Sequence, residues 1–150
     1  KDDFKGMLAA KSGFYMCSKD TIEVYFPSDD TPVSVITYVD DQKKSASFYK
    51  AANLEEKDAY TVFTGGNHSL IKIKSAAENT DNLLIIKDSY ANCFIPFIAP
   101  YYRNVIVVDP RYYFNDLNKL IKSEDITDVL FLYNANTLAT DSALKTMLTY

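Results

Sequence analysis

The chain has one histidine, two cysteines and no tryptophan among its 150 residues, and these scarcities limit the chemistry it can perform. Cys17 and Cys93 lack the spacing of metal ligands. Two buried thiols are therefore favoured over a metal site, and a disulfide between them stays open. The sequence contains no HExxH, Walker or GxGxxG motif, so zinc-peptidase and nucleotide-binding functions have no support. We expect no cofactor.

Long apolar runs and basic stripes are also missing. No run approaches the ~18 apolar residues of a membrane-spanning helix, and no signal peptide is recognisable. The formal net charge of −4 and the absence of a Lys/Arg stripe argue against a nucleic-acid-binding surface. The length suits one domain, so we expect a single α/β domain over residues 1–150. The first four residues suggest a cut through a longer protein, of which this chain is a part.

The first third of the chain, residues 1–50, is predicted to be rich in β-structure. Alternating or β-branched runs indicate strands over residues 21–26, 33–39 and 45–49. Turn residues at 27–30 and 40–43 separate these strands. We expect an antiparallel β element that lies beside the main sheet or is inserted into it.

The pattern changes from Tyr60 onward, where short strands are predicted over residues 60–63 and 70–74. Three strand–helix units follow, with strands at 83–86, 104–109 and 128–133 and helices at 89–102, 114–121 and 142–148. Continuous Ile/Val/Leu runs of this kind are typical of a parallel sheet buried on both faces. The sequence therefore predicts a three-layer, Rossmann-like α/β fold with a mostly parallel sheet.

Polar residues follow each of these three strands, and ligands of open α/β sheets bind at the carboxyl ends of strands. Ser89 comes where a buried strand ends and a helix begins, which is where such folds expose a nucleophile. The backbone N–H groups after Ser89 are candidate donors to an oxyanion. Alternatively, Asp88 or Ser89 only caps the helix, a role that both residue types favour.

His68 follows two glycines that permit a tight turn. As the single histidine it is a candidate base for Ser89, or a packed loop residue. The neighbouring Asn67 is a candidate side-chain donor to an oxyanion.

Further polar residues are candidates for contacting a ligand. Arg111 suits a carboxylate or a cluster of sugar hydroxyls, and Tyr112 and Tyr113 can form a wall beside it. Structural roles compete here too, because Asp109 can cap the next helix. The ligand-binding set that we predict is His68, Tyr90, Asn92, Arg111, Tyr112 and Asn134.

Several segments resemble the bacterial DHHW protein family. They are Leu83 to Asn92, Val107 to Tyr113, Asp128 to Leu138 and the Gly65-Gly66-Asn67-His68 turn, and the likeness covers most of the chain. The family is related to SGNH-type hydrolases and to proteins that acetylate exported polysaccharides. The resemblance implies an SGNH-type fold, Ser89 as nucleophile, an extracellular or cell-surface location, and an acylated carbohydrate or other small ester as substrate.

The chain departs from the family in lacking the Asp-His-His-Trp motif that supplies the acid and base. We expect this motif upstream of Lys1, so that the chain alone is inactive and His68 belongs to the ligand site. Two hypotheses stay open: part of a serine esterase or O-acyltransferase, or a non-catalytic glycan-binding or structural module of the cell envelope.

Overall fold

The computed structural model describes residues 1–6, 9, 12, 13, 16, 18–26, 35–40 and 42–149. These residues form two compact units, Lys1–Thr31 with Phe48–Gly66, and Pro32–Ser47 with Asn67–Tyr150. That both units make one domain stays a prediction. Cys17, the turn at 27–30 and the first residues of the 33–39 strand lie outside the described residues.

The described residues of the first unit form short elements. This unit contains two short 3-10 helices, η1 (Ala51–Glu55) and η2 (Ala59–Val62), and isolated bridges from Phe4 to Asp20 and from Tyr49 to Phe63. Aromatic rings hold its centre, since the Phe63 ring lies 5.2 Å from that of Tyr60 and 6.0 Å from that of Tyr49.

Two strands predicted for this unit are absent. Residues 21–26 form no strand, and residues 60–63 fall largely in η2. Local hydrogen bonds explain the second error, because the Thr61 N–H and hydroxyl both donate to the Asp58 carbonyl. Such bonds compete with a strand ladder for the same backbone.

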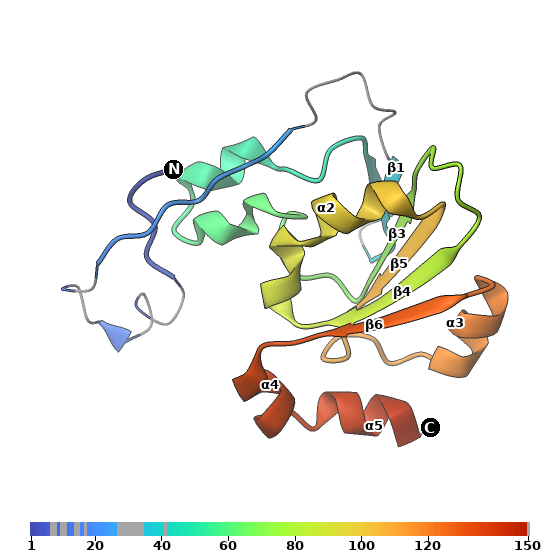
Figure 1. Ribbon diagram of the computed structural model, residues 1–150. Coiled ribbons are helices and arrows are strands. Elements are labelled where there is room, and N and C mark those ends of the chain that lie inside the picture. Colours follow the sequence, from blue (N-terminus) through green and yellow to red (C-terminus); the bar gives the residue numbers. More distant parts are fainter. Residues whose placement is uncertain are drawn as a thin grey trace. The chain divides into compact units, whose positions relative to one another are not determined.

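The second unit is built around a six-stranded sheet with helices on both faces (Figure 1). The strand order is β2-β1-β3-β5-β4-β6. The strands are β1 (Val35–Tyr38), β2 (Lys43–Ser45), β3 (Leu70–Lys74), β4 (Asn82–Lys87), β5 (Asn104–Val108) and β6 (Asp128–Leu132). This arrangement confirms the predicted α/β class.

The sheet is not mostly parallel, which corrects the prediction. Only β5, β4 and β6 run parallel, while β1 pairs with β2 and β3, and β3 with β5, in antiparallel fashion. The connection from β3 to β4 contains no helix, whereas a parallel crossover needs a dozen or more residues and usually a helix. The β1-β2 hairpin extends the same sheet, but its second strand is Lys43–Ser45 instead of the predicted 45–49.

The helices follow the strands as short segments. After β4 come η3 (Ser89–Cys93), α2 (Ile95–Ile98) and η4 (Ala99–Tyr101) in place of one long helix. The remaining helices are α3 (Leu117–Ser123), α4 (Ala135–Thr140) and α5 (Ala143–Thr149). In Figure 1, α2 lies on one side of the sheet and α4 and α5 lie on the other.

A buried apolar cluster joins one face of the sheet to α3. It comprises Leu70, Leu84, Ile86, Ile106, Val108, Tyr113, Leu117 and Leu120. Leu144 and Met147 of α5 pack against this cluster. The cluster supports the ends of β4 and β5, where the polar residues predicted to form a site begin.

No helix among the described residues is long and apolar enough to span a membrane.

Candidate functional site at the carboxyl ends of three parallel strands

The parallel register brings the carboxyl ends of three strands to one edge of the sheet. Ile86 of β4 pairs with Val108 of β5 and with Phe131 of β6. The residues that follow these strands, beginning with Asp88, Asp109 and Tyr133, therefore start at the same level. This is the arrangement predicted from the sequence.

Asp88 is the residue that caps η3. Its carboxylate accepts hydrogen bonds from the backbone N–H of Tyr90 and from that of Asn134, both at 3.0 Å, and the residue is 1% exposed. The first bond closes the turn after β4, and the second joins that turn to the segment after β6. The capping role left open between Asp88 and Ser89 thus falls to Asp88.

Ser89 is the first residue of η3 and is partly exposed. Neither its hydroxyl nor its N–H makes a hydrogen bond within the described part of the chain. The N–H groups that follow it are occupied, because Tyr90 donates to the Asp88 side chain and Ala91 to the Asp88 carbonyl. The expected oxyanion donors after Ser89 are therefore engaged in this structure.

Lys87, the last residue of β4, lies in a buried network of charges. Its ammonium is 3.3 Å from the Asp109 carboxylate, and both side chains are 0% exposed. The same carboxylate accepts from Nε and Nη2 of Arg111 at 2.9 and 2.7 Å. Burial lowers the pKa of Lys87, a shift that attraction to Asp109 only partly offsets.

Arg111 is held by Asp109 and keeps part of its side chain exposed. Hydrogen bonding to that carboxylate raises the guanidinium pKa further, so Arg111 is always charged. The guanidinium carbon lies 5.4 Å from the centre of the Tyr112 ring. Tyr112 and Tyr90 are 48% and 59% exposed, so both rings present surface to solvent.

Asn67 lies near η3, since its side-chain oxygen accepts from Nδ2 of Asn92 at 3.4 Å. Asn92 belongs to η3 and is 2% exposed, which makes it an interior link rather than a surface group. The structure therefore connects the Asn67 turn to the helix that begins with Ser89.

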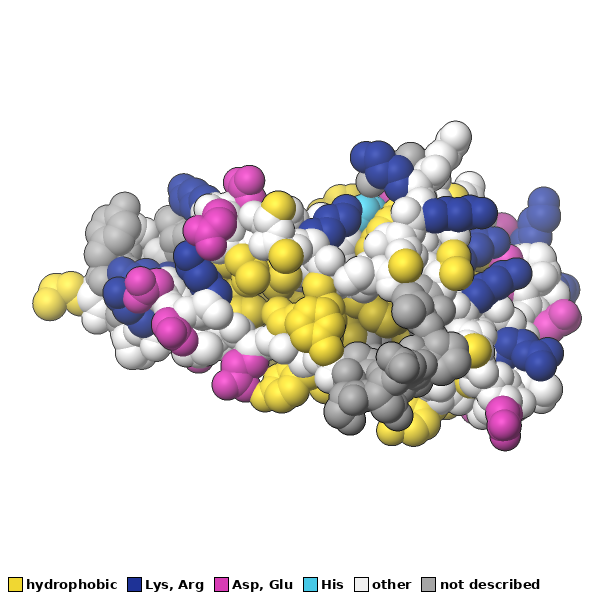
Figure 2. Space-filling model, turned by 90° about the horizontal axis from the view of Figure 1, so that it is seen from above, with side chains coloured by type: hydrophobic (Ala, Val, Ile, Leu, Met, Phe, Trp, Pro, Cys, Tyr) yellow, Lys and Arg dark blue, Asp and Glu magenta, His cyan; other side chains and the backbone are white. Residues whose placement is uncertain are grey.

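His68 packs against an aromatic ring. Its imidazole centre is 4.6 Å from that of Tyr38, and the residue is 8% exposed. Only a small part of a histidine side chain is visible in the space-filling view (Figure 2). His68 therefore has the geometry of a packed loop residue, which was the alternative to a catalytic base.

Asn134 serves as a helix cap. Its side-chain oxygen accepts from the N–H groups of Asn136 and Thr137 at the start of α4. This helix was not predicted. Asn134 was predicted to bind a ligand, and its side-chain oxygen is instead occupied by these backbone groups.

Sequence reasoning missed two members of this region, the buried Lys87 and the partly buried Tyr133. Lys87 is 0% exposed, but a lysine beside Asp88 at the end of a strand is ordinarily solvated, so its position in the sequence did not indicate its burial. Tyr133 has a buried hydroxyl without a hydrogen-bond partner among the described residues. Nothing in its sequence context indicates that burial.

Two cavities in the described part of the chain are lined by residues of α3 and its flanks, and the larger also by residues of α5. One, of about 550 Å³, is lined by Pro110, Arg111, Tyr113, Phe114, Asn115, Asp116, Leu117, Ala143, Thr146 and Met147. Ser89 lines neither cavity. Arg111 is the one residue of the charged network that reaches the larger cavity.

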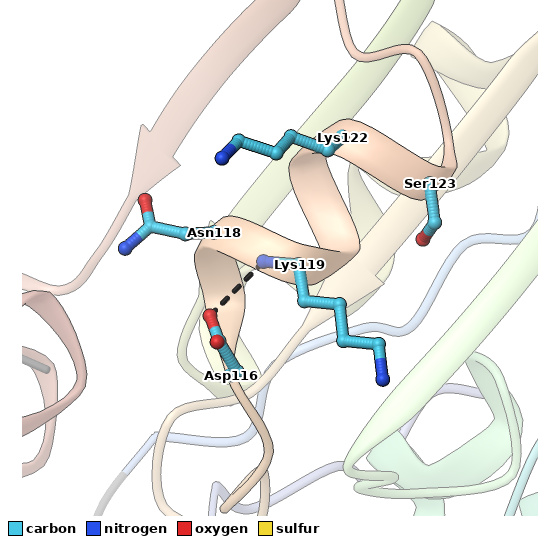
Figure 3. A pocket seen from close by; sticks show the side chains of 5 residues that line it. All are labelled: Asp116, Asn118, Lys119, Lys122 and Ser123. Carbon is cyan, nitrogen blue, oxygen red and sulfur yellow. Dashed lines mark hydrogen bonds between the residues drawn. The ribbon is translucent and has the colours of Figure 1, made fainter.

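The second cavity, of about 440 Å³, lies over α3 and is lined by Asp116, Asn118, Lys119, Lys122 and Ser123. Figure 3 shows Lys119 and Lys122 extending in different directions, while Asp116 accepts from the Lys119 backbone N–H at the helix start. One short helix supplies the lining, so this is a shallow polar surface. No cluster of metal-ligating side chains occurs among the described residues.

No protein-family model matches the chain, and neither does any curated protein sequence. The structure is similar to that of a DHHW family protein from Eubacterium siraeum, with 28% sequence identity and a TM-score of 0.77. That match covers 96% of this chain and 50% of the solved one.

Two structures of Bacillus cereus PatB1, one with a sulfonyl adduct, share the fold. Their identities are 22% and 23%, and their TM-scores are 0.61 and 0.65. They match 76% and 80% of this chain. The chain spans half or less of the length of these solved proteins. The resemblance to the DHHW family that the sequence predicts is thereby confirmed by a solved member of that family.

Proposed function

We propose that the chain is part of an SGNH-like serine esterase or O-acyltransferase that acts on acylated carbohydrate at the cell surface. The observation that carries this proposal is the Ser89 hydroxyl at the carboxyl end of β4, which makes no hydrogen bond among the described residues while Asp88 provides the cap. A serine whose hydroxyl neither caps a helix nor packs in the core is available to react.

In the proposed reaction, the Ser89 Oγ attacks the carbonyl carbon of an ester while a base accepts the hydroxyl proton. The tetrahedral intermediate expels the alcohol, which takes up that proton, and an acyl-serine remains. Water or a sugar hydroxyl then attacks the acyl-serine and restores the free hydroxyl. Hydrolysis and transfer differ only in this second nucleophile.

His68 is poorly placed to be the base, because its ring is buried against Tyr38. The proposal therefore assigns acid and base to an Asp-His pair in the remainder of a longer protein. A length twice that of this chain, as in the solved DHHW family protein, leaves room for such a pair. The chain alone is then inactive.

The oxyanion would be held by groups that the structure leaves available. The Ser89 N–H is one, and the Nδ2 group of Asn67 is the second. Two neutral donors of this kind are a common arrangement in acyl-transfer sites.

The sulfonyl adduct of PatB1 adds support from a protein of the same fold. A sulfonyl group becomes attached when a protein nucleophile displaces the leaving group of a sulfonyl reagent.

The test is acetyl-ester hydrolysis by the full-length protein that carries this chain. We expect Ser89→Ala to abolish turnover and Ser123→Ala, at the end of α3, to leave it unchanged. Equal turnover in the Ser89→Ala variant and the parent would overturn the proposal.

A glycan-binding module is the second candidate, favoured by the exposed rings of Tyr90 and Tyr112 and by Arg111 beside Tyr112. Aromatic faces and a fixed guanidinium suit sugar rings and their hydroxyls. For this function, Ser89→Ala is silent and Arg111→Ala or Tyr112→Ala weakens binding to an acetylated glycan.

A further inference from the structure

The edge strand β6 has the composition of an interior strand. Its residues 129–132 are Val-Leu-Phe-Leu, an uninterrupted apolar run typical of a parallel strand covered on both faces. Yet β6 is the last strand of the sheet, and Val129 and Phe131 are 48% and 49% exposed. Figure 1 shows it at the border of the sheet.

The opposite edge of the same sheet is built differently. There β2 has three residues, and two of them are Lys43 and Lys44. Short strands and lysines are how natural sheets protect an edge from pairing with another strand. The β6 edge has neither device, since it is five residues long with an apolar centre.

The register places apolar side chains of β6 on the same sheet face as buried side chains of β4. Val129 pairs with Leu84 and Phe131 pairs with Ile86, and both partners are at most 1% exposed. Paired residues of neighbouring strands lie on the same face of the sheet. The buried face of β4 therefore borders on the Val129 and Phe131 side chains, which are apolar but only half-buried.

The backbone of β6 also has a free side. The Asp88 N–H donates to the Leu132 carbonyl, so the backbone groups of Leu132 and Leu130 point toward β4. Those of Val129 and Phe131 then point away from it, because successive residues of a strand alternate.

We infer that β6 is an interior strand of a larger sheet, completed by an apolar strand from the remaining half of a longer protein. The solved DHHW family protein is similar to this chain over 50% of its own length, so such a protein has as many further residues as are present here. The added strand pairs with the Val129 and Phe131 backbone, and the structure that accompanies it covers their side chains. This inference does not depend on Ser89.

Amide hydrogen exchange tests the pairing. In the full-length protein we expect the Val129 and Phe131 amides to exchange slower, by roughly 100-fold or more, than in the 150-residue chain. The Leu130 amide, which faces β4, is the control and should be protected in both. Fast exchange at Val129 and Phe131 in the full-length protein would overturn the inference. Protection in the short chain that grows with its concentration would also overturn it, because the strand would then pair with a second copy.

A substitution gives an independent readout. Phe131→Lys should lower the unfolding temperature of the full-length protein and barely change that of the 150-residue chain. Leu138→Lys on α4, where Leu138 is 57% exposed, is the matched control and should be silent in both. Equal effects of Phe131→Lys in the two proteins would contradict coverage of β6.

Discussion

The ammonium of Lys87 lies 3.3 Å from the carboxylate of Asp109, and neither side chain is exposed to solvent. Arg111 binds the same carboxylate, so one buried anion serves two cations. Lys87 precedes the Asp88-Ser89 turn directly. The stability of the turn that presents Ser89 is therefore tied to a charged pair inside the protein.

Removing the shared carboxylate of Asp109 should lower the free energy of unfolding more than removing the Lys87 ammonium. Asp109→Ala leaves Lys87 buried beside Arg111 without a carboxylate partner, and we expect a loss of about 3–5 kcal/mol in the free energy of unfolding. Lys87→Met should cost less, because Asp109 keeps Arg111 and the methionine fills the space. Urea unfolding of both variants checks this order, and a costlier Lys87→Met would contradict it.

The ion pair between Lys72 and Glu124 provides a matched control on the same sheet. Its side chains are 37% and 24% exposed, in contrast to the buried pair. Lys72→Met should change the free energy of unfolding by no more than about 1 kcal/mol.

The Lys87 pair also predicts a dependence on pH. Burial lowers the pKa of Lys87 below its ordinary value of 10.5. Between the lowered value and 10.5 the unfolded chain binds more protons than the folded protein, so this group's contribution to stability rises with pH.

Comparison with Lys87→Met isolates that contribution, because the other titrating groups cancel. We expect the stability of the parent relative to Lys87→Met to increase as the pH rises toward 10.5. A relative stability that stays constant or falls over this range would show that the lysine keeps its ordinary pKa.

Tyr133 should respond to pH in the opposite sense. Burial, together with the charges of Asp109 and Asp141, raises the pKa of Tyr133 above its ordinary 10.0. The unfolded chain then loses this proton first, so stability falls as the pH rises past 10.0. Tyr133→Phe should lose less stability over that range than the parent does.

At neutral pH the Tyr133→Phe variant should be at least as stable as the parent. The buried hydroxyl has no partner among the described residues, and an unsatisfied buried group costs about 1–3 kcal/mol. Thermal unfolding measures the difference, and a variant clearly less stable than the parent would indicate that the Tyr133 hydroxyl makes a hydrogen bond in the folded protein.

Substitutions of Asp88 and Ser89 should have different effects on the free energy of unfolding. Asp88→Ala removes the η3 cap and the link to Asn134, at an expected cost of about 1–3 kcal/mol. Ser89→Ala removes a hydroxyl that has no hydrogen bond among the described residues and should stay within about 0.5 kcal/mol of the parent. A large loss from Ser89→Ala would mean that the serine has a structural role.

The strands from β3 onward could be predicted from the sequence because their signals are local. The prediction for β3 matches its observed bounds, and β4, β5 and β6 lie within a residue of theirs. Each is an apolar run that ends in polar residues, a pattern that needs no knowledge of the partner strand. The convergence of their carboxyl ends followed from parallel pairing of these three strands.

Strand direction and fine site geometry could not be predicted in the same way. The antiparallel pairing of β3 depends on a helix-free connection, and the 3-10 helix at Tyr60 depends on bonds to Asp58. Likewise, no local sequence pattern shows that the N–H groups after Ser89 donate hydrogen bonds to Asp88, or that Asn134 caps α4. Each of these hydrogen bonds and pairings depends on which groups the folded chain brings together.

Reaction with a sulfonyl fluoride distinguishes a nucleophilic Ser89 from a structural one. The full-length protein is treated with the reagent, and the modified residue is located by peptide mass mapping. We predict one sulfonyl group on Ser89, absent in Ser89→Ala and retained in Ser123→Ala. A full-length protein that stays unmodified at Ser89, or that is labelled equally in the Ser89→Ala variant, would show that Ser89 is not the nucleophile.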